Sequence, residues 1–263
     1  MSDALDTFPY ILTLDKIRRR FKERPSWIHI TTITMTCSLQ TGIDLNRIRE
    51  AFREQGSFRV RHKGALYSGH EWKMKETTFY NQVTIGYRDS YTTKSIKVFP
   101  NGSFQVAGCA DMYDCVRVTR SLSHLLSQIL AREDIKTAPF HVVMINTNFA
   151  LNHQVNLMEI FDQLSSKPKY DVSFDPDRYS AVKIKFAPRP GMKQVTASVF
   201  STGKVIVTGA ETLREIAFAY ETLNGELGIE GPKNNDDESA IVMGATFQQW
   251  VKTLTTRGVK PWL

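Results

Sequence analysis

The feature that most constrains this chain is a segment that occurs twice. Residues 97–111 read KVFPNGSFQVAGCAD, and residues 198–212 read SVFSTGKVIVTGAET. A fixed offset over a structured segment indicates a duplicated unit, so the chain is predicted to fold as two related halves. At an offset of 101 residues, five positions are identical: Val98 with Val199, Phe99 with Phe200, Gly102 with Gly203, Val106 with Val207, and Gly108 with Gly209.

The first half is predicted to contain strands and two helices. Polar and apolar residues alternate at 30–39, as in a half-buried strand, and a short helix follows with Asp44 as its cap. A long helix with an apolar stripe is predicted at about 110–131. Between the two helices, strands are predicted at 80–88, 95–99 and 103–107.

The second half is predicted to repeat this order. A strand is expected at 141–149, followed by a short helix with Asn156 as its cap, and a closing helix is expected at about 210–224. Between these helices, strands are predicted at 179–186, 194–200 and 204–208.

This order of elements divides the chain into four predicted parts, one of them with an insertion and one with a final helix. Residues 55–79 are predicted to form an irregular, basic insertion in the first half, and residues 240–256 a final helix. The four parts are a basic N-terminal extension at 1–26, a first repeat at 27–137, a second repeat at 138–230, and a polar linker with a C-terminal extension at 231–263.

Antiparallel strands with helices segregated from them indicate an α+β fold, with helices covering one face of the sheet. Strand alternation assigns the residues of the two hairpins to a buried face or an open face. Phe99 and Phe200 fall on the open face, where matched large aromatics favour a binding partner, unless each closes the edge of its own hairpin. The buried set is Ile96, Val98, Phe104, Val106, Val195, Ala197, Val199, Val205 and Val207. The open set is Ser95, Lys97, Phe99, Gln105, Ala107, Thr196, Ser198, Phe200, Ile206 and Thr208.

The charge balance is consistent with an anionic partner. The formal net charge is +7, which favours nucleic acid, although a solvated basic surface would give the same balance. The three cysteines contain no C-x-x-C pair, so a reducing, intracellular compartment is expected. The chain shows neither a signal-peptide pattern nor an apolar run of about 18 residues, so no membrane association is expected.

The sequence contains no motif of a common enzyme class. The P-loop, the G-x-G-x-x-G, H-E-x-x-H and G-x-S-x-G patterns are all missing, and the six histidines lack the spacing of metal ligands. Cys109 and Cys115 are expected to pack rather than react. We therefore expect no catalytic residue, no metal, no cofactor and no small-molecule substrate.

The repeated segment resembles a known family. VFSTGKVIVTGAE is similar to the signature hairpin of the TATA-box-binding protein family, and VFPNGSFQVAGCA resembles its first-repeat counterpart. The resemblance covers about residues 27–228. It implies a pseudo-two-fold saddle of two β-α-β-β-β(β)-α repeats, with one curved antiparallel sheet and helices on its convex face. It further implies a transcription initiation factor that lays its concave face on the minor groove of double-stranded DNA.

In this family, two pairs of phenylalanines wedge between base steps. The resemblance places the second members of these pairs at Phe99 and Phe200, and the first members at Tyr80 and Tyr179. Both first members depart from the family, because tyrosine keeps the flat apolar ring but adds a hydroxyl that needs a partner.

The family also reads base edges with asparagines and threonines near the pseudo-dyad, through acceptors that A·T and T·A share. Thr32 falls on the first asparagine site, and Met144 on the second, with Asn146 and Asn148 on the same face. Thr208 keeps one threonine, and Ala107 replaces the other. Lys97 and Gln105 replace apolar residues, which makes the first half more polar than the family pattern. The other DNA-facing positions implied are Lys183, Lys185, Thr196, Ser198, Lys204 and Ile206.

The segment FDPDRY, residues 174–179, resembles the acidic loop that receives a transcription-factor-IIB-like protein in this family. Asp175 and Asp177 match by position, with Pro176 between them, in a loop expected between a helix and a strand. A member from a large DNA virus would work with the viral RNA polymerase machinery at viral factories in the host cytoplasm, and is a candidate for packaging in the virion. The alternative is a protein-interaction platform that keeps the saddle fold without specific DNA binding.

Overall fold

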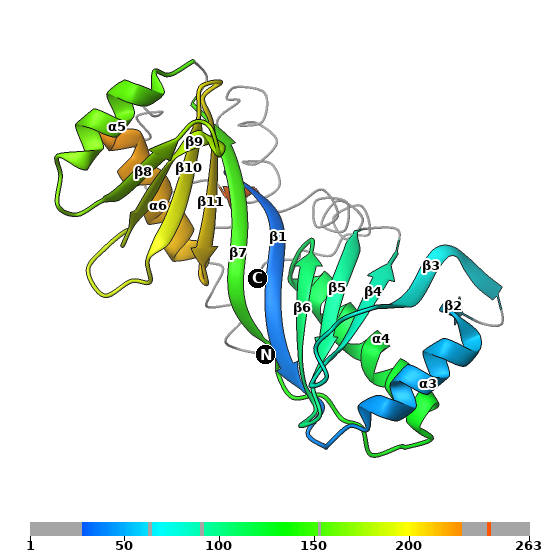
Figure 1. Ribbon diagram of the computed structural model, residues 1–263. Coiled ribbons are helices and arrows are strands. Elements are labelled where there is room, and N and C mark those ends of the chain that lie inside the picture. Colours follow the sequence, from blue (N-terminus) through cyan, green and yellow to red (C-terminus); the bar gives the residue numbers. More distant parts are fainter. Residues whose placement is uncertain (1–27, 63–64, 90–91, 152–153, 228–240, 243–263) are drawn as a thin grey trace, which may run out of the picture. The chain divides into compact units, whose positions relative to one another are not determined.

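The computed structural model describes residues 28–62, 65–89, 92–151, 154–227 and 241–242. The chain separates into two compact units, residues 32–143 and residues 1–31 together with 144–263 (Figure 1). We call them the first unit and the second unit, and each is described by itself.

The first unit is an antiparallel sheet with two helices. Its strands are ordered β2-β3-β4-β5-β6-β1, and α3 and α4 lie against one face of the sheet (Figure 1). The elements in chain order are β1 (Ile28–Ser38), α3 (Leu45–Gln55), β2 (Phe58–His62), β3 (Ala65–Lys75), β4 (Val83–Arg88), β5 (Thr93–Val98), β6 (Ser103–Cys109) and α4 (Met112–Leu130).

The second unit repeats this arrangement with one strand fewer. Its strands are ordered β7-β11-β10-β9-β8, with α5 and α6 against one face. A two-residue strand, β12 (Ile241–Val242), pairs in parallel with Ile28 and His29, the first residues of β1, which belong to this unit. The remaining elements are β7 (His141–Ala150), α5 (Leu157–Ser165), β8 (Asp171–Asp175), β9 (Tyr179–Phe186), β10 (Val195–Phe200), β11 (Lys204–Ala210) and α6 (Leu213–Glu226).

The predicted α+β class, with antiparallel strands and helices on one sheet face, is confirmed. The predicted irregular insertion at 55–79 is wrong, because this segment supplies β2 and β3, and β3 pairs along β4. The optional further strand of the β-α-β-β-β(β)-α repeat is present as β3 in the first unit and as β8 in the second, at positions that the sequence analysis did not give. Residues 241–242 form a strand rather than part of a helix, while the rest of 240–256 and the extension at 1–26 lie outside the described residues.

The turn glycines explain part of the sequence repeat. Gly102 and Gly203 have φ of 80° and 81°, a region that side-chain-bearing residues rarely adopt. Each donates its N–H to the phenylalanine three residues earlier, at 3.0 Å to Phe99 O and 2.8 Å to Phe200 O. At Gly102 a Cβ would also lie 1.9 Å from the carbonyl oxygen of Thr41. Both copies of the repeated segment therefore need a glycine three residues after the phenylalanine to close the turn.

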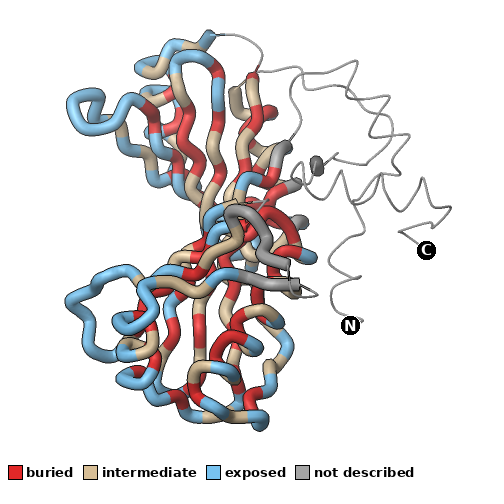
Figure 2. Tube along the Cα trace, turned by 90° about the vertical axis from the view of Figure 1, so that its right-hand side faces the viewer, coloured by how far each residue is buried: buried red, intermediate tan, exposed pale blue. Residues whose placement is uncertain are grey.

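Burial alternates along the strands of each unit, as the tube in Figure 2 shows. All nine residues of the predicted buried set are 0–1% exposed, which confirms that set. Their alternating neighbours lie on the face opposite the helices, which we call the open face of each unit. The predicted open set is half-buried or exposed, except Ser198, which is 9% exposed. Ser198 is buried because it is small and lies between Lys183 and Ile206 on neighbouring strands.

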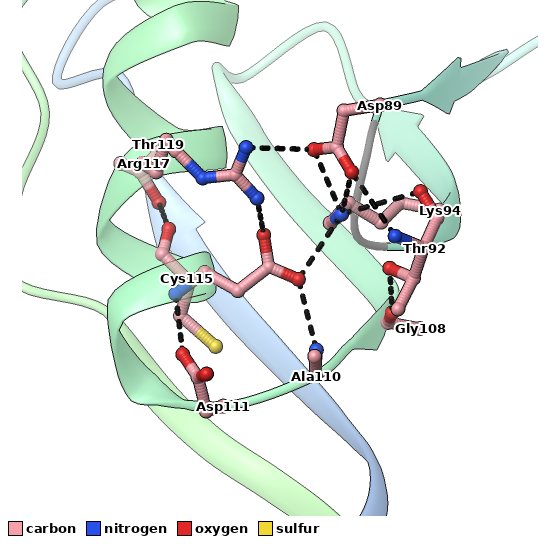
Figure 3. Close-up of polar contacts among 10 residues, drawn as sticks. Asp89, Thr92, Lys94, Gly108, Ala110, Asp111, Cys115, Arg117 and Thr119 are labelled. Atoms are coloured by element: carbon pink, nitrogen blue, oxygen red, sulfur yellow. Dashed lines mark hydrogen bonds and ion pairs between the residues drawn. The ribbon is translucent and has the colours of Figure 1, made fainter. Parts of the chain in front are cut away.

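A buried ionic cluster fixes α4 to the sheet of the first unit (Figure 3). The Lys94 ammonium group lies 3.0 Å from Asp89 Oδ2 and 3.0 Å from Asp114 Oδ2. Arg117 pairs with the same two carboxylates, at 2.9 Å from Asp89 Oδ2 and in close contact with Asp114. Burial raises the pKa of the neighbouring Tyr87 hydroxyl to about 12, with a further contribution from Asp89. The cluster joins β4, β5 and α4.

The same backbone position is held by a carboxylate in both units. Asp114 Oδ2 accepts the N–H of Ala110 at 2.8 Å, and Glu215 Oε2 accepts the N–H of Glu211 at 2.7 Å. Glu215 also completes a capping box with Thr212, which satisfies N–H groups at the start of α6.

None of the described helices is long and apolar enough to span a membrane.

Candidate nucleic-acid interface

The open face of the second unit carries an aromatic pair. Tyr179 begins β9 and Phe200 ends β10, and their ring centroids lie 5.7 Å apart with an interplanar angle of 66°. Phe200 is paired in register with Ala181, which is small and only 1% exposed. Tyr179 remains 37% exposed, and Phe200 is half-buried. Two flat rings therefore stand together at one end of the open face.

Lysines flank this pair. The Lys183 ammonium group lies 4.6 Å from the centroid of the Tyr179 ring, in a cation–π contact. Lys185 follows two residues later on the same face, opposite Thr196 of β10. Lys204 begins β11 and is exposed. Positive charge and exposed aromatic surface are thus adjacent on one unit.

Polar side chains line the other end of the open face of the second unit. Asn148 of β7 lies opposite Ile206 of β11, and Asn146 precedes it on the same face. The Thr208 hydroxyl donates to the carbonyl of Thr196 at 3.4 Å. Every second-unit residue that the family resemblance assigned to DNA therefore lies on the open face or at its edge.

The first unit differs in its aromatic positions. The predicted strand at 80–88 begins only at Val83, so Tyr80 lies in the preceding turn, where its side chain is 90% exposed. Within the described part of the chain, Tyr80 and Phe99 make no ring contact with each other, whereas Tyr179 and Phe200 do. Phe99 itself is half-buried. Of these two matched pairs of described residues, the one in the second unit makes a ring contact and the one in the first unit does not.

The Tyr80 turn is nevertheless held in place. The Arg49 guanidinium on α3 donates to the Tyr80 carbonyl at 2.6 Å and to the Gln82 carbonyl at 3.3 Å. Phe79, which sequence reasoning did not single out, is 68% exposed beside Tyr80. The pair of adjacent aromatic letters in TTFYNQ is the signal that could have identified it.

The open face of the first unit is polar. Lys97 of β5 lies opposite Gln105 of β6, and Ala107 lies opposite Thr34 of β1. Thr32 is half-buried at the start of this unit. These residues share one face, as the strand alternation predicted.

The acidic segment has a different setting from the predicted one. Asp175 ends β8, and Tyr179 begins β9, so Pro176 and Asp177 form the turn of a β-hairpin rather than a loop between a helix and a strand. The prediction failed because β8 is only five residues long and had not been recognised. Asp175 lies 3.8 Å from the Arg178 guanidinium, and all residues of the turn are exposed.

Comparison with solved structures identifies the class of fold. The chain is similar to the TATA-binding protein (TBP) of Methanococcus jannaschii, with a TM-score of 0.53 over 77% of this chain and 98% of that one. The two sequences are 12% identical in that comparison, so the likeness concerns the fold alone. The described units therefore have the fold of a TATA-binding protein.

Sequence comparison leads to the same family. Residues 139–227 match the family model of transcription factor TFIID, or TATA-binding protein. The chain is also 29% identical over 233 residues to a TATA-box-binding protein-like protein of Acanthamoeba polyphaga mimivirus. That match covers 73% of this chain and 63% of the length of the mimivirus protein. The family resemblance inferred from the repeated hairpin is thus supported by the family model, a viral relative and the fold.

Proposed function

We propose that this protein is a DNA-binding transcription initiation factor that contacts the minor groove of the duplex through its open sheet faces. The observation that carries the proposal is the Tyr179–Phe200 ring pair, flanked by Lys183 on the open face of the second unit. Flat rings can enter between base steps, and the lysines neutralise phosphates beside the opened step. The net charge of +7 acts in the same direction.

In minor-groove binders, for which the TATA-box-binding protein itself is the reference case, unstacking a base step costs a few kcal/mol and is offset by the contacts that the bent duplex makes. Asn146, Asn148 and Thr208 would supply hydrogen bonds to the groove edge, where A·T and T·A present the same acceptors. We therefore expect discrimination between A·T-rich and G·C-rich sites. Such a role requires neither catalysis nor a cofactor.

We also propose that the acidic turn recruits a protein partner. Asp175, Pro176 and Asp177 are exposed at a hairpin end, and acids there would repel phosphate, so a basic surface of a factor-IIB-like protein is the better match. The mimivirus relative supports a viral origin. With that origin, the proposed place of action is beside a viral RNA polymerase at viral factories. The more specific assignment, a protein of the kind found in African swine fever virus, is part of this proposal.

The polar open face of the first unit favours a second candidate function. Lys97, Gln105 and Ala107 stand where the family pattern has apolar residues or threonine, and Tyr80 does not form the ring pair seen in the second unit. A protein-interaction platform of the transcription machinery, without specific DNA binding, would tolerate these changes. The two candidates differ in whether the duplex is bound and bent.

A duplex titration at two salt concentrations tests the proposal. Wild-type protein should bind a labelled duplex with an affinity that falls steeply with salt, and should shorten the distance between end labels by bending. Phe200→Ala should weaken binding by about 30-fold, the effect of losing about 2 kcal/mol at an interface anchor, and should reduce bending.

Phe218→Ala is the matched control, because this half-buried phenylalanine lies on α6, in the helix layer of the same unit. Equal binding and bending by the Phe200 and Phe218 variants would contradict the wedge role. A wild-type protein that binds no duplex would favour the interaction platform.

A further inference from the structure

Strand β3 places two lysines on the open face of the first unit. Its register with β4 pairs Lys73 with Gly86 and Lys75 with Thr84. The intervening Trp72 points to the helix side, where it is 3% exposed and stacks on Tyr87 with a centroid distance of 3.9 Å. Because alternate residues of a strand face opposite sides, Lys73 and Lys75 lie on the open face, and both are exposed.

The two lysines belong to a larger basic row. Thr84 is also paired with Lys97 of β5, so Lys75, Thr84 and Lys97 stand side by side on three neighbouring strands. With strands about 4.8 Å apart, the backbones at Lys75 and Lys97 are separated by about 10 Å, and those at Lys73 and Lys75 by about 7 Å. Three ammonium groups can therefore meet one extended anion.

A glycine gives Lys75 its position. A Cβ built on Gly86 would lie 3.1 Å from Cε of Lys75 and 4.0 Å from its Nζ. The stem of Lys75 thus occupies the space that a side chain at position 86 would fill. The lysine lies along β4 and keeps its ammonium group on the open face.

Within the part of the chain that the structure describes, no acid neutralises these lysines. In the described part of the chain, Lys73, Lys75 and Lys97 form no ion pair. The acid on the open face of β3 is Glu71, which lies 4.0 Å from Arg59 and accepts a hydrogen bond from the Ser57 hydroxyl at 2.7 Å. Like charges at this spacing repel one another, and an extended anion would remove that repulsion.

The second unit lacks this arrangement. Its outermost strand, β8, places Asp171 opposite Lys185 and Ser173 opposite Lys183 on the open face. Lysines there have an acid or a hydroxyl as their neighbour on β8, whereas in the first unit β3, the strand next to β4, supplies lysines. The basic row is therefore a property of the first unit and not of the shared fold.

We infer that Lys73, Lys75 and Lys97 form a phosphate-binding strip that engages the backbone of duplex DNA on the first unit. The inference rests on the proposed function and adds a phosphate contact on β3, a strand that lies within the segment predicted to be an irregular insertion. It also gives the polar first unit a role: it holds the backbone by charge, while the second unit supplies the aromatic pair.

The test is the salt dependence of duplex binding, measured by fluorescence anisotropy between 50 and 200 mM salt. Each phosphate contact contributes about 0.9 to the slope of log K against log salt, so Lys73→Gln with Lys75→Gln should lower the magnitude of the slope by about 1.8. Over this fourfold change in salt, the variant should lose about 12-fold less affinity than wild type does. Lys73→Arg with Lys75→Arg should restore the wild-type slope.

The matched control is Arg120→Gln with Lys136→Gln. It removes the same charge from an exposed position on α4 and from an exposed position in the connection that follows α4. The single variant Lys73→Gln, with an expected change of about 0.9, keeps the inference testable if the double variant does not fold.

A slope for the double variant equal to that of the control would overturn the inference, even if wild type binds and Phe200→Ala reduces bending. The two proposals can therefore fail separately. A duplex RNA of the same sequence provides the remaining comparison. Loss of RNA binding with unchanged DNA binding would also overturn the assignment to DNA.

Discussion

The ammonium group of Lys94 lies 3.0 Å from Asp114 Oδ2, and the side chains of both residues are 0–1% exposed. A charge removed from water in this way is tolerated only when opposite charges surround it. Asp89 and Arg117 complete the set, so two cations face two carboxylates. The cluster connects the start of β5 with the first turns of α4 and therefore determines where that helix lies on the sheet.

Lys94→Met should destabilise the protein by about 3–5 kcal/mol, because it leaves two buried carboxylates with a single cation. The free energy of unfolding measured in urea checks this expectation. Lys136→Met is the control, since that exposed lysine forms no ion pair in the described part of the chain and should change stability by about 0.5 kcal/mol or less. Equal stability of the two variants would show that the cluster does not hold the helix.

Lys204→Ala should weaken binding to all duplexes by a similar factor and lower the slope of the salt dependence by about 0.9, because an exposed lysine at the edge of the open face contacts phosphate rather than base edges. The measurement compares A·T-rich and G·C-rich duplexes over a range of salt. A change in preference between the two duplexes, at a constant slope, would place Lys204 at the bases instead.

Reversal of the acidic turn, Asp175→Lys with Asp177→Lys, should abolish recruitment of a factor-IIB-like partner while DNA binding stays the same or becomes slightly tighter. Charged groups at the rim of an interface govern association with a charged partner, and added lysines attract phosphate. Gel-shift experiments with and without the partner measure both effects. The competing explanation is that the turn only positions Tyr179; in that case DNA bending would fall and the ternary complex would persist.

Glu226 should give the second unit a stability that depends on pH. Its carboxylate pairs with Lys167 and Lys169, and hydrogen bonds from these two lysines lower its pKa from 4.5 to about 2. A lowered pKa in the folded state means that the stabilisation is fully present above about pH 4.5 and is lost as the pH falls through about 2.

The thermal midpoint of Glu226→Gln should therefore lie below that of wild type at pH 7, and the difference should vanish as the pH approaches 2. Glu133→Gln is a suitable control, because Glu133 is exposed and forms no ion pair among the described residues. A difference that stays constant from pH 7 to pH 2 would contradict the assignment.

The sequence predicted the parts of the fold that local patterns determine. The caps at Asp44 and Asn156 follow from side-chain oxygens placed before apolar helices, and both accept backbone N–H groups as expected. The buried sides of the hairpins follow from strict alternation. Strands β3 and β8 were not located, although β8 and the last five residues of β3 alternate polar and apolar residues, because these alternating stretches are only five residues long and pairing with β9 and β4 makes them strands.

The residues of the candidate interface could be predicted only where the pairing register of the strands could be predicted. Tyr179 and Phe200 meet because a 21-residue separation returns β10 alongside β9, which the family resemblance indicated. The burial of Lys94 could not be predicted from its own strand, because it depends on Asp89, which follows β4, and on Asp114 of α4. Lys73 and Lys75 could have been found from the alternation in EWKMK, which places charged and apolar residues on opposite sides of a strand.

The additional strand β2 affects how readily individual strands open within each unit. It pairs with β3 only as far as Trp72, so Glu71 and Trp72 have paired strands on both sides, whereas β8 pairs only with β9 among the described strands. In native-state hydrogen exchange, the amides of Glu71 and Trp72 should therefore exchange more slowly than those of β8, which can detach without disturbing another described strand. Strand β2 thus secures β3 up to the residue before Lys73, while the acidic hairpin of the second unit ends in a strand that is free to open.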